Sequence, residues 1–503
     1  MSDITQGNLS RSGLSGSLLL LLRQLVPLTI VAIALWFLKD KFTGADLGSV
    51  RDAVAQVTFS QWVGAVAATG VSFCAVGRYD AVLHGVLSTN ISKSVAQKSG
   101  AVAIAIAQFT GFGALTGALV RWRLLRNVSL WQATRISLAV STSFVAGWAV
   151  ITAIVIGLAG YETPIMQIAC VTVLSIFVGL VLLSLLQPCG LTGLPPVRAM
   201  LAVLALTTID TFFAGAAFWS VLPSSLNISM VDLLPIFLLA FGAGLLGGTP
   251  GGLGSFELML LALLPTAPAE PLLVAALAFR LVYYVLPALL AVVYLFLGSH
   301  AKKQTCEVSL ASPAGPFLPP QDENTIWVAD FAEVNLVRQR RFVLLKLSHT
   351  PIALLARTGQ SLVLLTAPFT RKTSPDQCLK SLSFLANSCH RAPFVHKCLA
   401  RIATIARAKG WAIVRVGQQA WIRPADFSLD GSQRRQLRRM IRKARSAGAT
   451  ITPASHPLPL ERMREISNQW VLKRGAERGF SMGVLNRIMC SASGYFWPGM
   501  GLI

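Results

Sequence analysis

The chain has 503 residues, of which 54% are hydrophobic and only 13% are charged, and its mean hydropathy is +0.62. Soluble domains carry about a quarter charged residues, so this composition excludes a single water-soluble globule, and it equally excludes a disordered chain. Residues 1–300 hold 14 basic and 10 acidic side chains, a net charge of +4, and residues 301–503 hold the remaining 30 and 11, a net of +19. An apolar first part therefore precedes a basic second part, whose charge favours a polyanion such as membrane phosphates or nucleic acid.

Eight apolar runs lie in the first part, and a membrane-spanning helix needs about 20 mostly apolar residues. The first run is long and lacks a small-residue cleavage site, so it is predicted to be an anchor and not a signal peptide. The runs cover residues 18–38, 60–77, 100–120, 136–160, 163–187, 199–222, 233–265 and 271–298.

Two of these runs are predicted to be broken helices. Residues 233–256 contain seven glycines, and Pro250 lies among them. A straight helix does not tolerate that density of glycine around a proline, whereas a re-entrant segment that lines a protein-enclosed cavity does. The run at 100–120, with Gly111, Gly113 and Gly117, is a weaker copy. Close helix packing by small residues is the alternative interpretation.

Ionisable residues within the apolar runs are candidates for function, because a charge at bilayer depth costs several kcal/mol unless it is paired or hydrated. Asp210, Glu257 and Arg280 lie well inside their runs, and Arg78 and Asp80 end the second run. For Arg78, snorkelling to the membrane surface is an equally good interpretation.

The basic connections predict the topology. They lie at 1–23, 88–98, 121–135, 198 and 301–303, and the positive-inside rule assigns them to the cytoplasm. All of them fall on one side only if runs 100–120 and 233–265 are re-entrant, which leaves six full crossings. The C-terminal part is then cytoplasmic.

The second part is predicted to be a mixed α/β or α+β domain. A proline-containing linker covers 301–325. Four strands are predicted at 341–347, 352–355, 361–366 and 412–416, and two helices at 378–388 and 399–409. The eight cysteines form no CxxC pair, so no metal site and no cofactor are expected.

A strongly cationic helix is predicted to begin near Asp430 and to run to about Ala447, followed by a second amphipathic helix at 460–473. Seven cations within twelve residues would repel one another without an anionic partner, which could be tRNA phosphates or lipid headgroups. A solvated surface is the alternative. The expected phosphate-binding residues are Arg434, Arg435, Arg438, Arg439, Arg442 and Lys443, and Arg445 adds the seventh charge.

Two sets of motifs resemble the lysylphosphatidylglycerol synthase/flippase family, the multiple peptide resistance factor family. In the membrane part they are GGTPGGLGSFE at 247–257, the RYD triplet at 78–80, and GALTGALVRWRLL at 113–125. In the basic part they are WIRPADFSLDG at 421–431, RRQLRR at 434–439 and RGFSMG at 478–483. The resemblance implies lipid translocation at Arg78, Asp80, Gly251, Gly252, Glu257 and Arg280.

This resemblance implies a polytopic α-helical membrane domain with re-entrant segments at 1–300, the linker, and a cytosolic α+β domain of tandem acetyltransferase-like (GNAT) folds at 326–425 and 426–503. The second fold is expected to be incomplete, because the similarity stops near Gly483. No catalytic residue can be assigned from these motifs. The implied location is the bacterial inner membrane.

The implied activity is transfer of an aminoacyl group, expected to be lysyl, from aminoacyl-tRNA to phosphatidylglycerol, followed by translocation of the product to the outer leaflet. The partners would be phosphatidylglycerol, lysyl-tRNA and the membrane, with self-association left open. A translocator with an inactive cytosolic domain, and a membrane-bound regulatory or nucleic-acid-binding protein, are the alternatives.

Overall fold

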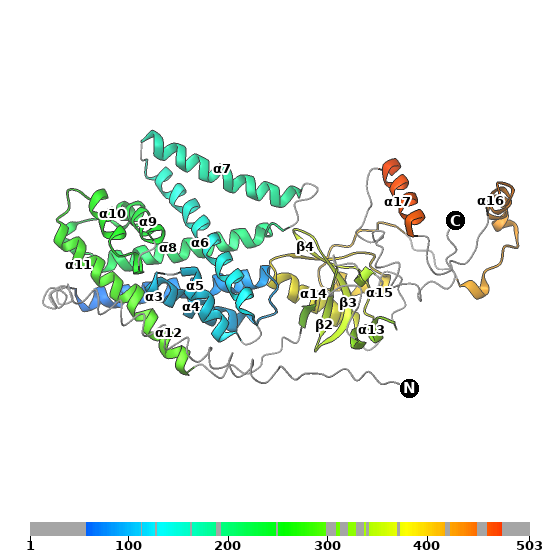
Figure 1. Ribbon diagram of the computed structural model, residues 1–503, viewed down its shortest axis with the longest axis horizontal. Coiled ribbons are helices and arrows are strands. Elements are labelled where there is room, and N and C mark those ends of the chain that lie inside the picture. Colours follow the sequence, from blue (N-terminus) through cyan, green and yellow to red (C-terminus); the bar gives the residue numbers. More distant parts are fainter. Residues whose placement is uncertain are drawn as a thin grey trace, which may run out of the picture. The chain divides into compact units, whose positions relative to one another are not determined.

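The structure is a computed structural model, and it divides into two compact units (Figure 1). Residues 1–306 with 386–391 form the first unit, and residues 307–385 with 392–503 form the second. The residues that it describes are 57–111, 113–125, 128–160, 163–187, 193–247, 250–297, 308–311, 320–327, 336–338, 342–369, 373–417, 423–449 and 460–474.

Within the described residues of the first unit, five helical segments are long and apolar enough to cross a membrane. They match five of the six predicted full crossings, while the predicted crossing at 18–38 lies outside the described residues. The last segment joins α11 (Ala269–Arg280), the π-helical turn η3 (Leu281–Val285) and α12 (Leu286–Leu297). The other four are α3 (Phe59–Val86), α6 (Leu130–Leu158), α7 (Pro164–Leu186) and α8 (Val197–Ser220).

The two runs predicted to be broken are each divided into two helices. The first break lies between α4 (Lys93–Thr110) and α5 (Gly113–Leu124), and Gly111 adopts the left-handed conformation there with φ 79°. The second break lies between α9 (Met230–Leu246) and α10 (Ser255–Leu263), and it contains the short 3-10 helix η2 (Pro250–Gly252).

Both breaks reverse the chain, since α4 packs against α5 and α9 packs against α10. At 1.5 Å per residue, α5 is about 18 Å long and α10 about 14 Å, well short of the roughly 30 Å of hydrocarbon. The helix breaks are therefore confirmed, and their re-entry into the membrane stays a prediction.

The two broken segments meet inside the bundle. The longest helix–helix interface joins α3 and α8, while α4 packs on α3, on α12 and on η2. An aromatic cluster fills the core beside the second break, with Phe256, Phe279 and Tyr283 stacked in series and Phe218 and Phe237 packed against them. Because η2 contacts α4, the two breaks lie around a common interior.

The second unit contains a five-stranded mixed sheet in the order β1-β2-β3-β4-β5. The first four strands are antiparallel neighbours, and β5 joins β4 in parallel after the crossover helix α14 (Pro375–Ser388). The strands are β1 (Val308–Ala311), β2 (Phe342–Leu347), β3 (Thr350–Arg357), β4 (Ser361–Leu364) and β5 (Ala392–Val395). A mixed α+β domain is thus confirmed, and tandem acetyltransferase-like folds stay a prediction.

The structure differs from the sequence-based expectation at two places in this unit. The stretch expected as a linker contains β1, which pairs with β2, and the helix α13 (Pro320–Trp327). The strand predicted at 412–416 is wrong, because these residues pair with no strand among those described. In both cases the deciding factor is pairing with a distant strand, which local apolar alternation does not specify.

Three further α-helices follow β5 among the described residues. All three were predicted, the last two from periodicity and the first with Gly410 as its C-cap. They are α15 (Ala400–Ala408), α16 (Arg435–Ser446) and α17 (Leu460–Arg474). The short 3-10 helices η5 (Pro424–Asp426) and η6 (Ser432–Arg434) precede α16.

The predicted topology can be tested by cysteine accessibility in a chain whose eight native cysteines are replaced. Trp131→Cys at the start of α6 should react only with a membrane-permeant thiol reagent, since this basic connection is assigned to the cytoplasm. Thr163→Cys, next to α7, is the control for the opposite side and should react with an impermeant reagent in intact cells. Labelling of Trp131→Cys by the impermeant reagent would overturn the six-crossing topology.

Candidate functional site

The second break is held by a single arginine. Arg280, at the end of α11, donates from Nη1 to the Gly251 carbonyl at 2.5 Å and from Nη2 to the Gly252 carbonyl at 3.2 Å. The same guanidinium donates from Nε to Glu257 Oε1 at 2.8 Å, and the other oxygen of Glu257 accepts from the Gly254 amide at 2.9 Å. Arg280 and Glu257 thus satisfy three backbone groups that the broken helix leaves without helical partners.

Glycine is required at the second break for two reasons. Gly251 and Gly252 have φ values of 60° and 68°, a conformation that disfavours residues with a Cβ. At Gly252, moreover, a Cβ would approach the Gly244 Cα to 2.9 Å. The glycines in the GGTPGGLGSFE string therefore permit a tight turn against α9, which explains the local pattern recognised in the sequence.

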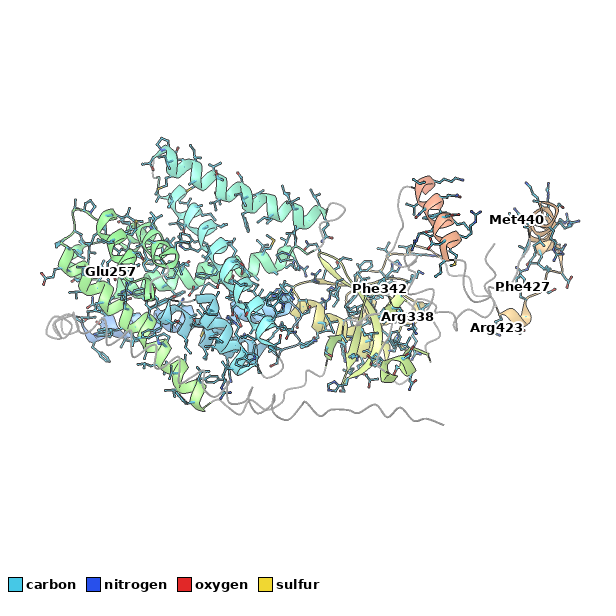
Figure 2. All side chains as sticks on the ribbon, viewed as in Figure 1. Glu257, Arg338, Phe342, Arg423, Phe427 and Met440 are labelled. Carbon is cyan, nitrogen blue, oxygen red and sulfur yellow. The ribbon has the colours of Figure 1, made fainter. Side chains whose placement is uncertain are left out.

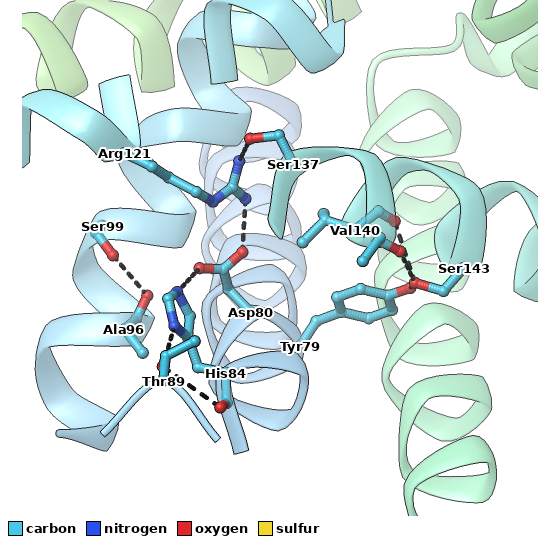
Figure 3. Close-up of polar contacts among 11 residues, drawn as sticks. Tyr79, Asp80, His84, Thr89, Ala96, Ser99, Arg121, Ser137, Val140 and Ser143 are labelled. Atoms are coloured by element: carbon cyan, nitrogen blue, oxygen red, sulfur yellow. Dashed lines mark hydrogen bonds and ion pairs between the residues drawn. The ribbon is translucent and has the colours of Figure 1, made fainter. Parts of the chain in front are cut away.

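The first break is held by a second arginine–carboxylate pair (Figure 3). Arg121 on α5 donates to Asp80 on α3 at 2.5 Å and to Ser137 on α6 at 2.8 Å. His84 lies one turn beyond Asp80, with its Nε2 3.4 Å from the Asp80 carboxylate and its Nδ1 2.8 Å from Thr89 Oγ1. The Asp80 and Arg121 side chains are only 0% and 2% exposed, so this ion pair is fully removed from solvent.

The two breaks use the same pair of groups with the roles exchanged. At the first break the arginine belongs to the broken segment and the carboxylate to the neighbouring helix, while at the second break Glu257 belongs to the broken segment and Arg280 to the neighbour. A buried arginine or carboxylate without its partner would be strongly unfavourable. The first pair therefore fixes its broken segment against the preceding helix α3, and the second pair fixes its broken segment against the following helix α11.

A cavity of about 290 Å³ lies between the two breaks. Gly111, Gly113 and Ala114 line it from the first break, and Gly244 and Gly252 line it from the second. Its polar wall comprises Tyr79, Gln108, Arg121, Ser141, Thr207, Asp210 and Tyr284. The interior space that the glycine pattern predicted is thus present, with buried charges of both signs in its wall.

The predicted translocation residues do not all lie on this cavity. Gly252 lines it, whereas Asp80, Gly251, Glu257 and Arg280 are not among its lining residues. Asp80, Glu257, Gly251 and Arg280 instead hold the breaks that shape the cavity, and Arg78 lies on the exposed face of α3. The translocation role of these residues stays a prediction, and the geometry assigns four of them to positioning.

Two charged residues of the cavity wall were not among the residues to which the resemblance assigned translocation. Arg121 had appeared only in a basic connection and in the GALTGALVRWRLL motif, whereas Asp210 was a functional candidate because it is ionisable and lies inside an apolar run. Both are almost completely buried, with residue exposures of 2% and 1%. For Asp210 the signal was its isolation within apolar sequence, whereas Arg121 lies close to Arg123 and Arg126 and gave no such signal. The spacing did not show which partner each residue meets.

In the second unit, α16 carries its cations on the surface. No residue of α16 is buried, and Met440 on its apolar stripe is 60% exposed (Figure 2). Arg438 donates to the Leu429 and Gly431 carbonyls, and Arg434 stacks over the Phe427 ring at 4.9 Å. Among the described residues, no carboxylate pairs with any of the predicted phosphate-binding cations of α16 and η6.

Two described cysteines of the second unit, Cys378 and Cys398, provide no reactive thiolate at neutral pH. Burial raises the pKa of the Cys378 thiol to about 12 and also raises the pKa of Cys398. Both thiols therefore stay protonated, and a thiol is a poor nucleophile compared with its thiolate. Across the described ranges, no group of three or more His, Cys, Asp and Glu side chains is placed to hold a metal ion.

A double-mutant cycle tests the buried pair at the first break. Asp80→Asn and Arg121→Gln should each lower the free energy of unfolding by about 3–5 kcal/mol, because each leaves an unpaired buried charge. The double variant should be more stable than the sum of the two losses predicts. Thermal unfolding of the detergent-solubilised protein measures this.

The matched control for this cycle is Arg78→Gln, an exposed arginine of the same helix, which should change stability by less than about 1 kcal/mol. Strict additivity of the Asp80 and Arg121 losses would show that the two side chains do not form an ion pair.

Neutralising the cations of α16 tests the predicted polyanion surface. Changing Arg435, Arg439 and Arg442 to Gln should weaken binding to tRNA or to anionic vesicles by about 1 kcal/mol per cation and reduce the salt dependence of binding. Arg462 and Arg464 on α17, which pair with Glu465 and Glu461, provide the control when changed to Gln. If the salt dependence of binding is unchanged for both tRNA and anionic vesicles, α16 is excluded as a polyanion-binding surface.

Comparison with known proteins identifies one matching family and individual relatives. Residues 329–493 match the family "Phosphatidylglycerol lysyltransferase, C-terminal". The chain is also 29% identical over 245 residues to the uncharacterized protein slr0712 of Synechocystis sp., an alignment that covers 44% of this chain and 75% of that protein.

Two further relatives match shorter segments. Inner membrane protein YbhN of Escherichia coli is 34% identical over 113 residues, 22% of this chain and 35% of that protein. Phosphatidylglycerol lysyltransferase of Staphylococcus haemolyticus is 34% identical over 93 residues, 18% of this chain and 11% of that protein. The five apolar helices among the described residues, these relatives and the match at residues 329–493 together confirm the predicted resemblance: the chain is a membrane protein similar to the phosphatidylglycerol lysyltransferases.

Proposed function

We propose that the protein transfers an aminoacyl group, expected to be lysyl, from aminoacyl-tRNA to phosphatidylglycerol and moves the product lipid to the outer leaflet. The family match of residues 329–493 supports the transfer reaction. The observation that carries the translocation step is the cavity of about 290 Å³ between the two helix breaks. Broken helices that enclose a cavity with polar groups in its wall are typical of binding sites in membrane transporters.

The transfer reaction requires few catalytic groups from the protein. The lipid hydroxyl oxygen attacks the carbonyl carbon of the aminoacyl ester, a new C–O bond forms, and the bond to the tRNA ribose oxygen breaks. The proton of the lipid hydroxyl passes to the released ribose oxygen. Because the ester is already activated, positioning of the two substrates and a general base suffice. The cationic surface of α16 supports a role in holding the tRNA or the anionic lipid.

The product explains the biological effect that we propose. Phosphatidylglycerol carries one negative charge, and adding a lysyl group with two amino groups gives a lipid with a net positive charge. A more positive outer leaflet attracts cationic peptides less strongly. We infer that the protein lowers the negative charge of the cell surface and thereby provides resistance to cationic antimicrobial peptides.

A leaflet-resolved lipid assay separates the two activities. The full chain is expressed in a bacterial host that lacks aminoacyl lipids, and lipids are extracted before and after an impermeant amine reagent labels the outer leaflet. Appearance of aminoacyl phosphatidylglycerol is expected, with a labelled fraction. No aminoacyl lipid in the host, but outward movement when the lipid is supplied, would support the alternative, a translocator with an inactive cytosolic domain.

Glu257→Gln tests whether the second break matters for translocation. The amide keeps one acceptor oxygen for Arg280 but loses the charge and the acceptor of the Gly254 amide. Some loss of stability is therefore expected, and transfer is normalised to the amount of folded protein. In a host that supplies the modified lipid, we expect the outer-leaflet fraction to fall severalfold while total aminoacyl lipid is unchanged. Glu270→Gln, an exposed glutamate in the first turn of α11, is the matched control. Normal outward transfer in Glu257→Gln would remove this residue from the site.

A further inference from the structure

Asp210 is a buried carboxylate in the wall of the cavity. It lies on α8, and its Oδ1 accepts hydrogen bonds from Ser72 on α3 and from Tyr283 on η3, the latter at 3.2 Å. The hydroxyls of Ser72 and Tyr283 are 3.0 Å apart. Three elements therefore hold one oxygen of this carboxylate in a fixed position.

The second oxygen of Asp210 is left without a partner. Oδ2 is buried and accepts no hydrogen bond from the residues that the structure describes. The neighbouring ionisable groups do not neutralise it: Tyr79 on α3 and Tyr284 on η3 face it without a positive charge, and Arg121 across the cavity is paired with Asp80. Asp80 and Glu257 each have an arginine, whereas Asp210 forms no ion pair among the described residues.

The hydrogen-bonding groups of the cavity indicate which kind of ligand group could donate a hydrogen bond to Asp210 Oδ2. Gln108 on α4 also lines the cavity, and its Oε1 is a second buried acceptor without a partner. Two unpartnered acceptors suit a group that only donates hydrogen bonds. A primary ammonium has three N–H donors, no acceptor and a positive charge, and a hydrogen bond between charged groups is stronger than one between neutral groups.

The wall of the same cavity also offers the complementary chemistry. Arg121 lines the same cavity, and its Nε is a buried donor without a partner in the described part of the chain. This N–H suits an ester or phosphate oxygen. The cavity thus presents acceptors at Asp210 and Gln108 and a cationic donor at Arg121, which matches a headgroup with an ammonium and an anionic group.

We propose that Asp210 is the receptor for a primary ammonium group of the lipid headgroup and that, with Gln108, it selects lipids that carry an amine. This inference takes its lipid ligand from the proposed function, but it concerns binding and does not require translocation. An ammonium at Oδ2 neutralises the buried carboxylate, whose charge otherwise remains uncompensated at a strongly unfavourable free energy.

The test compares two lipids that differ only in their amines. The full chain, purified in detergent, is titrated with lysyl-phosphatidylglycerol and with the same lipid after acetylation of both amino groups. The wild-type protein should bind the free amine at least about tenfold more tightly. Asp210→Asn should reduce this preference to about twofold or less, because the amide removes the charge. Ser72→Ala keeps the carboxylate and should retain most of the preference.

Asp232→Asn is the matched control, since Asp232 is an exposed aspartate at the start of α9, and it should bind as the wild type does. Gln108→Leu provides a second test that leaves the charge of Asp210 in place and should lower the preference severalfold. If Asp210→Asn cannot be recovered folded, an unchanged preference in Gln108→Leu overturns the proposal.

The outcomes distinguish this proposal from the proposed function. A wild-type preference that persists in Asp210→Asn overturns the proposal and leaves the proposed function intact. Equal binding of both lipids by the wild type overturns the proposal. It also contradicts the part of the proposed function that makes an amine-bearing lipid the translocated product. A preference that Asp210→Asn abolishes, in a protein that shows no outward transfer in the leaflet assay, supports the proposal and rejects translocation.

Discussion

Interrupting a helix inside a membrane domain creates backbone polar groups that need new partners, and the architecture of the first unit depends on how these groups are satisfied. At the second break the Arg280 guanidinium binds the Gly251 and Gly252 carbonyls together with the Glu257 carboxylate. One side chain thus supplies four donor contacts from a neighbouring helix. Arginine suits this position because its planar fork presents several donors in a fixed geometry, which lysine cannot reproduce.

The first break shows that the arrangement is repeated with exchanged charges. Arg121 belongs to the broken segment there and binds Asp80 of α3, whereas Glu257 belongs to the second broken segment and binds Arg280 of α11. Such pairs contribute little net stability compared with apolar packing, but they strongly disfavour any arrangement that separates them. They therefore fix the two broken segments against α3 and α11, and the cavity between the breaks follows from that packing.

The buried charges differ in how far the protein itself satisfies them. The two arginine–carboxylate pairs are ion pairs, although Arg121 Nε has no partner among the described residues, while Asp210 lines the cavity and has no cationic partner there. The second unit is organised differently, because its sheet has an apolar core and its cations lie on the exposed surface of α16. Buried charges in the membrane part favour selective recognition of a headgroup, and surface charges on α16 favour salt-dependent binding of a polyanion.

The sequence by itself determined the features that depend on neighbouring residues. Apolar run length predicted the spanning helices, the glycines and Pro250 predicted the second break, and periodicity predicted α16 and α17 to within a few residues. Only the tertiary structure decided which distant residues meet: Asp80 with Arg121 across 41 positions, and Asp210 with Ser72 across 138. It also placed β1 beside β2 and left 412–416 out of the sheet. The physical reason is that helix breaks and amphipathic faces arise from local backbone preferences, whereas ion-pair partners, strand neighbours and cavity walls are set by the packing of the whole unit.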